Sequence, residues 1–165
     1  MEWNEDLERI ALQERELQLP RLDAEIAWEL GSSLRTMAAE RRLAIVIDVR
    51  RFGQPLFYAA MDGTTPDNVE WVRRKSNVVA RFHRSSYAVG LKEKTKNESL
   101  LESQGLPIAD YATHGGSFPL AVAGAGVIGS ATVSGLPERG DHELVIEALC
   151  AILKHDYEQL KLSAE

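Results

Sequence analysis

The sequence has a single cysteine, Cys150, so no disulfide can form within one chain. A lone thiol is typical of proteins of reducing compartments, and we therefore expect a cytoplasmic protein. No run approaches the ~20 apolar residues that a membrane helix needs. The acidic segment 1–10 also lacks the basic and apolar regions of a secretory signal. We therefore expect neither membrane attachment nor export.

An excess of positive charge is absent as well. The 165 residues contain 19 Lys and Arg against 25 Asp and Glu, a net charge of −6, which argues against general nucleic-acid binding. The hydrophobic content of 44% excludes a disordered chain. A chain of this length is typical of one domain with its own core, and we expect a single domain over residues 1–165.

Hydrophobic periodicity predicts the order ααββααββα. Helical spacing covers residues 4–18, 22–42, 65–84, 87–91 and 98–104, and a last helix capped by Asp141 that carries Leu160. Strands are predicted at 44–49, 56–60, 118–122 and 127–133, with an exposed turn at 92–98. Short connections favour antiparallel hairpins. The fold class expected is α+β, an antiparallel sheet of four or five strands flanked by helices.

Residues 124–129 spell Gly-x-Gly-x-x-Gly, the pattern of a dinucleotide-binding loop. That function requires a helix directly after the glycines, whose N-terminus holds the pyrophosphate. A predicted strand follows here instead. We therefore interpret the segment as a hairpin turn.

The predicted helix 65–84 is rich in positive charge. Its polar candidates are Arg73, Arg74, Lys75, Asn77, Arg81 and Arg84. Spacings of four, eight and eleven residues from Arg73 place Asn77, Arg81 and Arg84 on one face, which suits a carboxylate or phosphate ligand. The alternative is a solvated or inter-subunit face, paired with acidic side chains elsewhere.

The segment 111–119 contains His114-Gly115-Gly116-Ser117. Glycines before a strand allow a positive φ or a close approach to a ligand. His114 is a candidate heme ligand or general acid/base, and Ser117 a candidate hydrogen-bond donor. The alternative is a shaped loop whose histidine bonds the backbone. No Gly-x-Ser-x-Gly segment supports a serine hydrolase.

His114 and His142 are weak candidates for a metal site, should the fold bring them together. The sequence lacks the His-Glu-x-x-His and Cys-x-x-Cys spacings of common metal sites. Helix capping by itself explains Asp141. We therefore predict no metal.

Several segments together resemble the uncharacterised branch of the heme-degrading-domain superfamily, similar to GlcG- and HbpS-type proteins. They cover residues 5–10, 56–57, 63–68, 71–75, 81–82, 85–87, 111–112, 114–119, 133–137 and 141–142. The resemblance implies a profilin-like α+β fold and homo-oligomers. It also makes heme a candidate cofactor, because some relatives bind or degrade it.

Three functions remain in view. In the first, a small anionic ligand or heme binds where the basic helix meets the His-Gly-Gly-Ser loop. Arg73 and Arg81 would then meet the propionates and His114 the iron. In the second, the chain is a non-catalytic homo-oligomeric adaptor with Trp71, Phe82 and the arginines between subunits. In the third, His114 serves as acid/base in an enzyme acting on a small anionic metabolite. The candidate ligand-binding residues are Arg73, Arg74, Lys75, Asn77, Arg81, His114, Gly115, Gly116 and Ser117.

Overall fold

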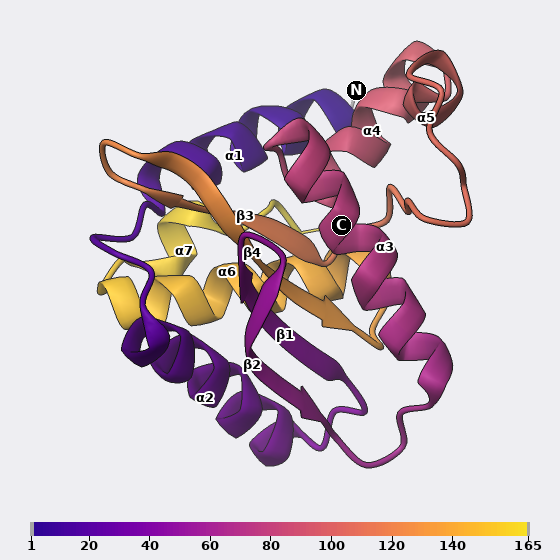
Figure 1. Cartoon of the computed structure of the whole chain (residues 1–165). Helices are drawn as coiled ribbons and strands as arrows, with labels where there is room; N and C mark the ends of the chain where they lie inside the picture. Colours follow the sequence, from indigo (N-terminus) through magenta and orange to yellow (C-terminus); the bar gives the residue numbers. More distant parts are fainter. Residues whose placement is uncertain (1, 165) are drawn as a thin grey trace.

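The computed structural model describes residues 2–164 and contains a four-stranded sheet between layers of helices (Figure 1). The helices are α1 (Glu2–Glu16), α2 (Ala24–Arg41), α3 (Pro66–Phe82), α4 (Ser86–Lys96), α5 (Leu100–Ser103), α6 (Glu138–Leu153) and α7 (Tyr157–Leu160). The strands are β1 (Val46–Arg51), β2 (Gln54–Ala60), β3 (Ser117–Val122) and β4 (Gly126–Ser134). The strand order is β2-β1-β4-β3 and all three pairings are antiparallel. The predicted α+β fold is confirmed, with four strands in the sheet.

The two faces of the sheet differ in chemistry because side chains alternate along each strand. One face presents Ile47, Val49, Val133 and Phe118 to α2 and α6, and these residues belong to the main apolar core. The opposite face carries polar side chains, and α3 crosses it over β3 and β4. The polar side chains on this face are those of Asp48, Arg50, Ser117, Ser130, Thr132 and Ser134. The surface hollows described below lie between α3 and this polar face of the sheet.

A smaller apolar cluster joins the two ends of the chain. Ile10 of α1 packs with Tyr87, Ala88 and Leu91 of α4, and Leu162 completes the cluster. This packing places α1 and the C-terminal segment beside α4 and α6. The N-terminal helix is thus part of the folded body.

The Gly-x-Gly-x-x-Gly segment begins in the turn between β3 and β4, as predicted, and its last four residues belong to β4. Gly124 and Gly126 both have a φ of 81°, and the amide of Ala125 donates to the carbonyl of Val122. No helix follows, since β4 begins at Gly126. The segment therefore lacks the helix N-terminus of a dinucleotide site.

The prediction of an exposed turn at residues 92–98 was wrong, because α4 continues to Lys96. The Ser85 side chain accepts from the amide of Ala88 and starts the helix, which buries Ser86 to Leu91. Asn97 then ends it in the left-handed conformation. A helix whose first six residues are buried thus extends through a polar stretch that has little periodicity of its own.

Other helix boundaries also differ from the prediction. Helix α6 begins at Glu138, so Asp141 lies inside the first turn, and Leu160 belongs to the separate helix α7. Helix α3 ends at Phe82, because His83 adopts the left-handed conformation and donates its amide to Val79. Arg84 therefore leaves the α3 face and pairs with Glu14 of α1 at 2.5 Å. Within residues 2–164, no helix is both long and apolar enough to cross a bilayer.

Candidate functional site

A hollow of about 250 Å³ lies where the first half of α3 meets the His-Gly-Gly segment and the start of α6. We call it the His114 hollow. Asp67, Trp71, Lys75, His114, Glu138 and Asp141 are among the residues that line it. Three elements distant in sequence thus form one concave surface on the polar side of the sheet.

His114 is an exposed residue at the edge of this hollow. Its ring lies edge-on to that of Trp71, with centroids 5.1 Å apart and an interplanar angle of 80°. Among residues 2–164, no hydrogen-bond partner of the imidazole is found, so the backbone bond offered as an alternative is absent there. Arg74 covers Trp71 at 4.9 Å, and the indole nitrogen donates to Asp67 at 3.2 Å. The imidazole is therefore an available ligand beside a fixed aromatic ring.

Lys75 forms the floor of the hollow, and only 3% of its side chain is exposed. Its ammonium donates to the carbonyls of Gly115 and Val133, each at 2.9 Å, and to Asp141 at 3.0 Å. Burial lowers the pKa of Lys75 and raises that of Asp141, while their mutual attraction opposes both shifts. All three ammonium donors are engaged, so Lys75 holds the loop and has none left for a ligand.

The two glycines are needed because backbone passes close to them. A Cβ on Gly115 would lie 2.3 Å from the carbonyl oxygen of Glu138. Gly116 has a φ of +136°, and a Cβ there would lie 2.3 Å from the oxygen of Val133. Ser117 is buried, and its hydroxyl lies 2.8 Å from that of Thr132. These residues hold the loop against β4 and α6.

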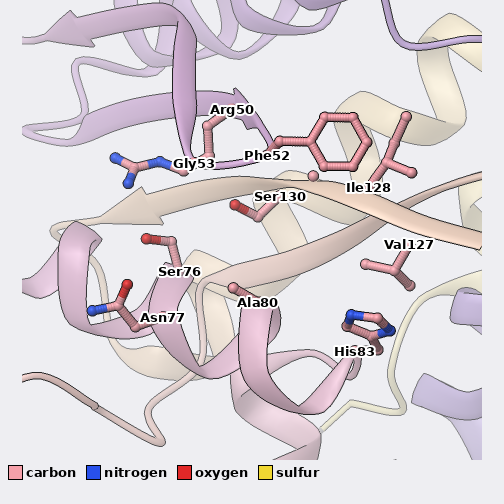
Figure 2. A pocket seen from close by; sticks show the side chains of 11 residues that line it. Arg50, Phe52, Gly53, Ser76, Asn77, Ala80, His83, Val127, Ile128 and Ser130 are labelled. Atoms are coloured by element: carbon pink, nitrogen blue, oxygen red, sulfur yellow. The ribbon is translucent and has the colours of Figure 1, made fainter.

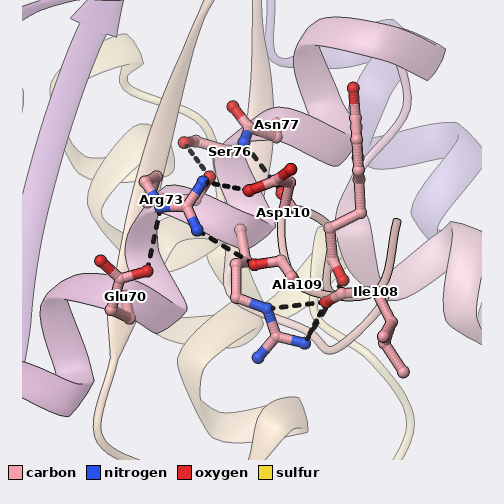
Figure 3. A network of polar contacts seen from close by, with 9 residues as sticks. Glu70, Arg73, Ser76, Asn77, Ile108, Ala109 and Asp110 are labelled. Atoms are coloured by element: carbon pink, nitrogen blue, oxygen red, sulfur yellow. Dashed lines mark hydrogen bonds and ion pairs between the residues drawn. The ribbon is translucent and has the colours of Figure 1, made fainter. Parts of the chain in front are cut away.

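Three polar side chains on α3 bind the segment 108–111 rather than the hollow (Figure 3). Arg73 pairs with Asp110 and Glu70, each at 3.0 Å. Arg74 donates to the carbonyl of Ile108 at 2.8 Å, and Asn77 donates to that of Asp110 at 2.8 Å. For Arg73, the alternative to ligand binding is therefore observed: its guanidinium pairs with acidic side chains of the same chain.

The predicted arginine face is not gathered into one site. Arg81 is exposed and does not line the hollow. No ion pair or hydrogen bond of its guanidinium is found within the described part of the chain. Since Arg84 lies beyond the end of α3, the expected common face reduces to residues that mainly anchor a loop.

His142 has a different environment from His114. It is fully buried beside Tyr87 and Phe118, and its Nε2 lies 2.8 Å from Oε1 of Gln13. Its Nδ1 has no hydrogen-bond partner among the described residues. Burial, with a smaller contribution from Arg139, lowers its pKa to about 3. Across residues 2–164, no three His, Cys, Asp or Glu side chains are grouped to hold a metal.

The arrangement of these elements identifies the class of protein: a profilin-like α+β domain with an antiparallel sheet between helical layers. A model of the family described as haem degrading protein HbpS-like matches residues 22–150. The chain belongs to this family. It is 65% identical over 158 residues to a UPF0303 protein of Burkholderia thailandensis, covering 96% of each chain.

Solved structures share the fold of this chain. The crystal structure of Ybr137w protein matches with a TM-score of 0.82 and 26% identity, over 90% of this chain and 88% of the other. The PduOC:heme complex matches with a TM-score of 0.68 over 82% of this chain and 99% of the other. At 18% identity, the second match shows a shared fold.

The sequence analysis missed the acidic part of the hollow and the role of Asp141. Asp67 and Glu138 line the hollow beside His114, although they are far apart in the sequence. One signal was available for Lys75, which lies between Val72 and Val79 at helical spacing, on the side of α3 that turned out to be buried. That spacing separates Lys75 from its partly exposed basic neighbours Arg73 and Arg74.

Proposed function

We propose that this protein binds a small ligand at the His114 hollow, and that heme is that ligand. The observation that carries the proposal is the exposed imidazole of His114, which has no bonded partner in the described chain and stands beside the ring of Trp71. A neutral imidazole is the commonest metal ligand in proteins and the axial ligand of many haem proteins.

The residues of the hollow fit the iron of heme better than its propionates. Lys75 is buried in an ion pair, and the carboxylates of Asp67 and Glu138 line the same surface. The volume of about 250 Å³ is below the ~300–1,000 Å³ typical of pockets that enclose a ligand, so the hollow would cover only part of a heme molecule. We therefore assign His114 to the iron and no residue of the hollow to the propionates. The earlier pairing of propionates with Arg73 and Arg81 is not retained.

The comparisons support heme as the first ligand to test. The matching family is described by haem degradation, and one structural neighbour was solved as a heme complex. Bound heme would supply an iron centre. In this proposal His114 binds the iron and Lys75 holds the loop that carries His114. We assign no reaction to the protein. The lone buried thiol of Cys150 accords with the proposed cytoplasmic location.

A hemin titration followed by absorption tests the proposal. We expect a Soret shift that saturates near one equivalent for the unchanged protein and is lost in His114→Ala. His155→Ala is the matched control, because His155 is also exposed but lies outside the hollow and away from α3. Equal binding by His114→Ala, or equal losses in both variants, would refute ligation at His114.

A homo-oligomeric adaptor is the second candidate function. Trp71 and Phe82, which were predicted to lie between subunits, are only partly exposed. Large apolar side chains are more exposed elsewhere, with accessible fractions of 68% for Trp28, 79% for Phe52 and 74% for Ile108. Aromatic residues of this kind are enriched at subunit interfaces. Light scattering at micromolar concentration should then show an oligomer, and a monomer would exclude this function.

A further inference from the structure

A second hollow, of about 170 Å³, lies toward the other end of α3, between that helix, β4 and the β1–β2 turn. We call it the amphipathic slot. It shares no lining residue with the His114 hollow. Figure 2 shows the side chains of Arg50, Ser76, Asn77 and Ser130 toward one end of the slot, and the apolar side chains, with His83 beside Val127, toward the other.

The polar end is built from Arg50 of β1 and Ser130 of β4, which are cross-strand partners. The Nε and Nη2 atoms of Arg50 bind Asp48 at 2.7 and 2.9 Å. Its Nη1 has no bonded partner within residues 2–164. Ser130 is 4% exposed, and its hydroxyl likewise lacks a hydrogen bond in the described chain. Figure 2 shows this hydroxyl turned toward the end where Arg50 and Ser76 lie. Unused donors therefore converge at this end.

The apolar end consists of Phe52, Val127 and Ile128 (Figure 2). Phe52 has a φ of +50°, which is uncommon for a bulky residue. Its amide donates to the carbonyl of Ile128 at 2.9 Å, so the turn holds the two residues together. The result is an exposed aromatic ring fixed at the rim of a small hollow.

The charges of the two hollows differ. None of the residues lining the slot is acidic; the basic Arg50 lies at its polar end, and His83 lies beside Val127 at the apolar end. The buried carboxylate of Asp48 is already paired with Arg50. By contrast, Asp67, Glu138 and Asp141 line the His114 hollow. An anionic group is therefore better matched to the slot, and the small volume limits the ligand to a few carbon atoms beyond that group.

We propose that the amphipathic slot binds a small organic carboxylate with a short apolar tail. The carboxylate accepts hydrogen bonds from Nη1 of Arg50 and the hydroxyl of Ser130. The tail packs against Phe52, Val127 and Ile128. This site is independent of the heme proposal, because the two hollows have different walls.

An NMR titration with hexanoate tests this assignment, with 1-hexanol as the uncharged analogue. We expect saturable shifts at the amide of Ser130 and the methyl groups of Val127 and Ile128, with a dissociation constant on the order of 1 mM. Hexanol should bind at least about fivefold more weakly, because it lacks the charge that Arg50 recognises. Equal affinities for the two compounds, or shifts scattered over the surface, would overturn the proposal.

Variants separate the slot from other apolar surfaces. Ala80→Leu fills the slot from an exposed helical position and should weaken hexanoate binding about tenfold or more. Ala11→Leu makes the same change on the exposed side of α1 and should leave binding unchanged. Ser130→Ala should reduce the preference for hexanoate over hexanol. His114→Ala should retain hexanoate binding, even if it loses heme. Unchanged binding in Ala80→Leu, with an intact amide spectrum, would exclude the slot.

Discussion

The ammonium of Lys75 lies 3.0 Å from the carboxylate of Asp141, and neither side chain is more than 4% exposed. This ion pair connects α3 with α6. Because Lys75 also binds the carbonyls of Gly115 and Val133, it fixes the loop that carries His114. A residue that resembles a ligand-binding cation in the sequence thus acts as an internal support.

Lys75→Met should destabilise the protein by about 3–5 kcal/mol, because it leaves the buried charge of Asp141 uncompensated. Urea denaturation at pH 7 measures the loss. Lys94→Met is the control, since Lys94 pairs with Glu138 at 3.0 Å but is 48% exposed. The control should change stability by less than about 1 kcal/mol. Similar losses in both variants would contradict a special role for the buried pair.

Gly116→Ala should cost more than about 1 kcal/mol, because both the backbone angle and the space exclude a side chain. The test compares it with Gly124→Ala, whose φ of +81° is also positive but whose Cβ would meet nothing within 4 Å. The free energies of unfolding of the two variants, measured by heat or urea, separate the cost of backbone strain from the cost of the steric clash with Val133. Equal losses would mean that the contact with Val133 has no energetic effect.

His142 should make the protein less stable in acid. Its pKa is lowered from 6.5 to about 3 in the folded protein, so the unfolded chain takes up a proton first as the pH falls. The resulting stability loss begins near pH 6.5 and continues to about pH 3, reaching about 2 kcal/mol at pH 5. Glu143 lies on the same helix with a raised pKa, which acts in the opposite direction.

The comparison of the unchanged protein with His142→Gln isolates this contribution, because Glu143 is present in both. Urea denaturation at pH 7 and pH 5 should show a smaller loss of stability in the variant. An identical pH dependence in the two proteins would show that His142 does not contribute.

Arg73→Ala should loosen the segment 105–112 without unfolding the protein, because it removes the contacts to Asp110 and the carbonyl of Ala109. Hydrogen exchange of the Ala112 amide, which donates to the carbonyl of Arg74, reports this loosening. We expect exchange to become several-fold faster. Arg81→Ala serves as the control and should leave this exchange rate unchanged.

Much of the fold follows from local patterns in the sequence. The β-branched run near Ile47 and the alternation around Thr132 predict strands, and Thr65-Pro66 predicts the start of α3. The glycines at 124–126 suit a hairpin because they adopt positive φ. Each of these signals is contained within a few consecutive residues, so the elements can be predicted without knowledge of tertiary contacts.

Helix boundaries and side-chain roles that depend on long-range packing were harder to predict from the sequence. Asp141 was expected to cap a helix, whereas its carboxylate binds Lys75 and the amides of Gly135 and Leu136. The continuation of α4 through a polar stretch gave no clear periodic signal either.

By itself, the sequence determined the α+β class, the antiparallel hairpins and the basic character of α3. Only the tertiary structure decided which of those basic groups remain available. Arg73 and Lys75 lie close in the chain, yet one binds a surface loop and the other a buried carboxylate 66 positions away. The reason is physical: buried polar groups need partners, and close packing of helix, loop and sheet supplies those partners from distant parts of the chain.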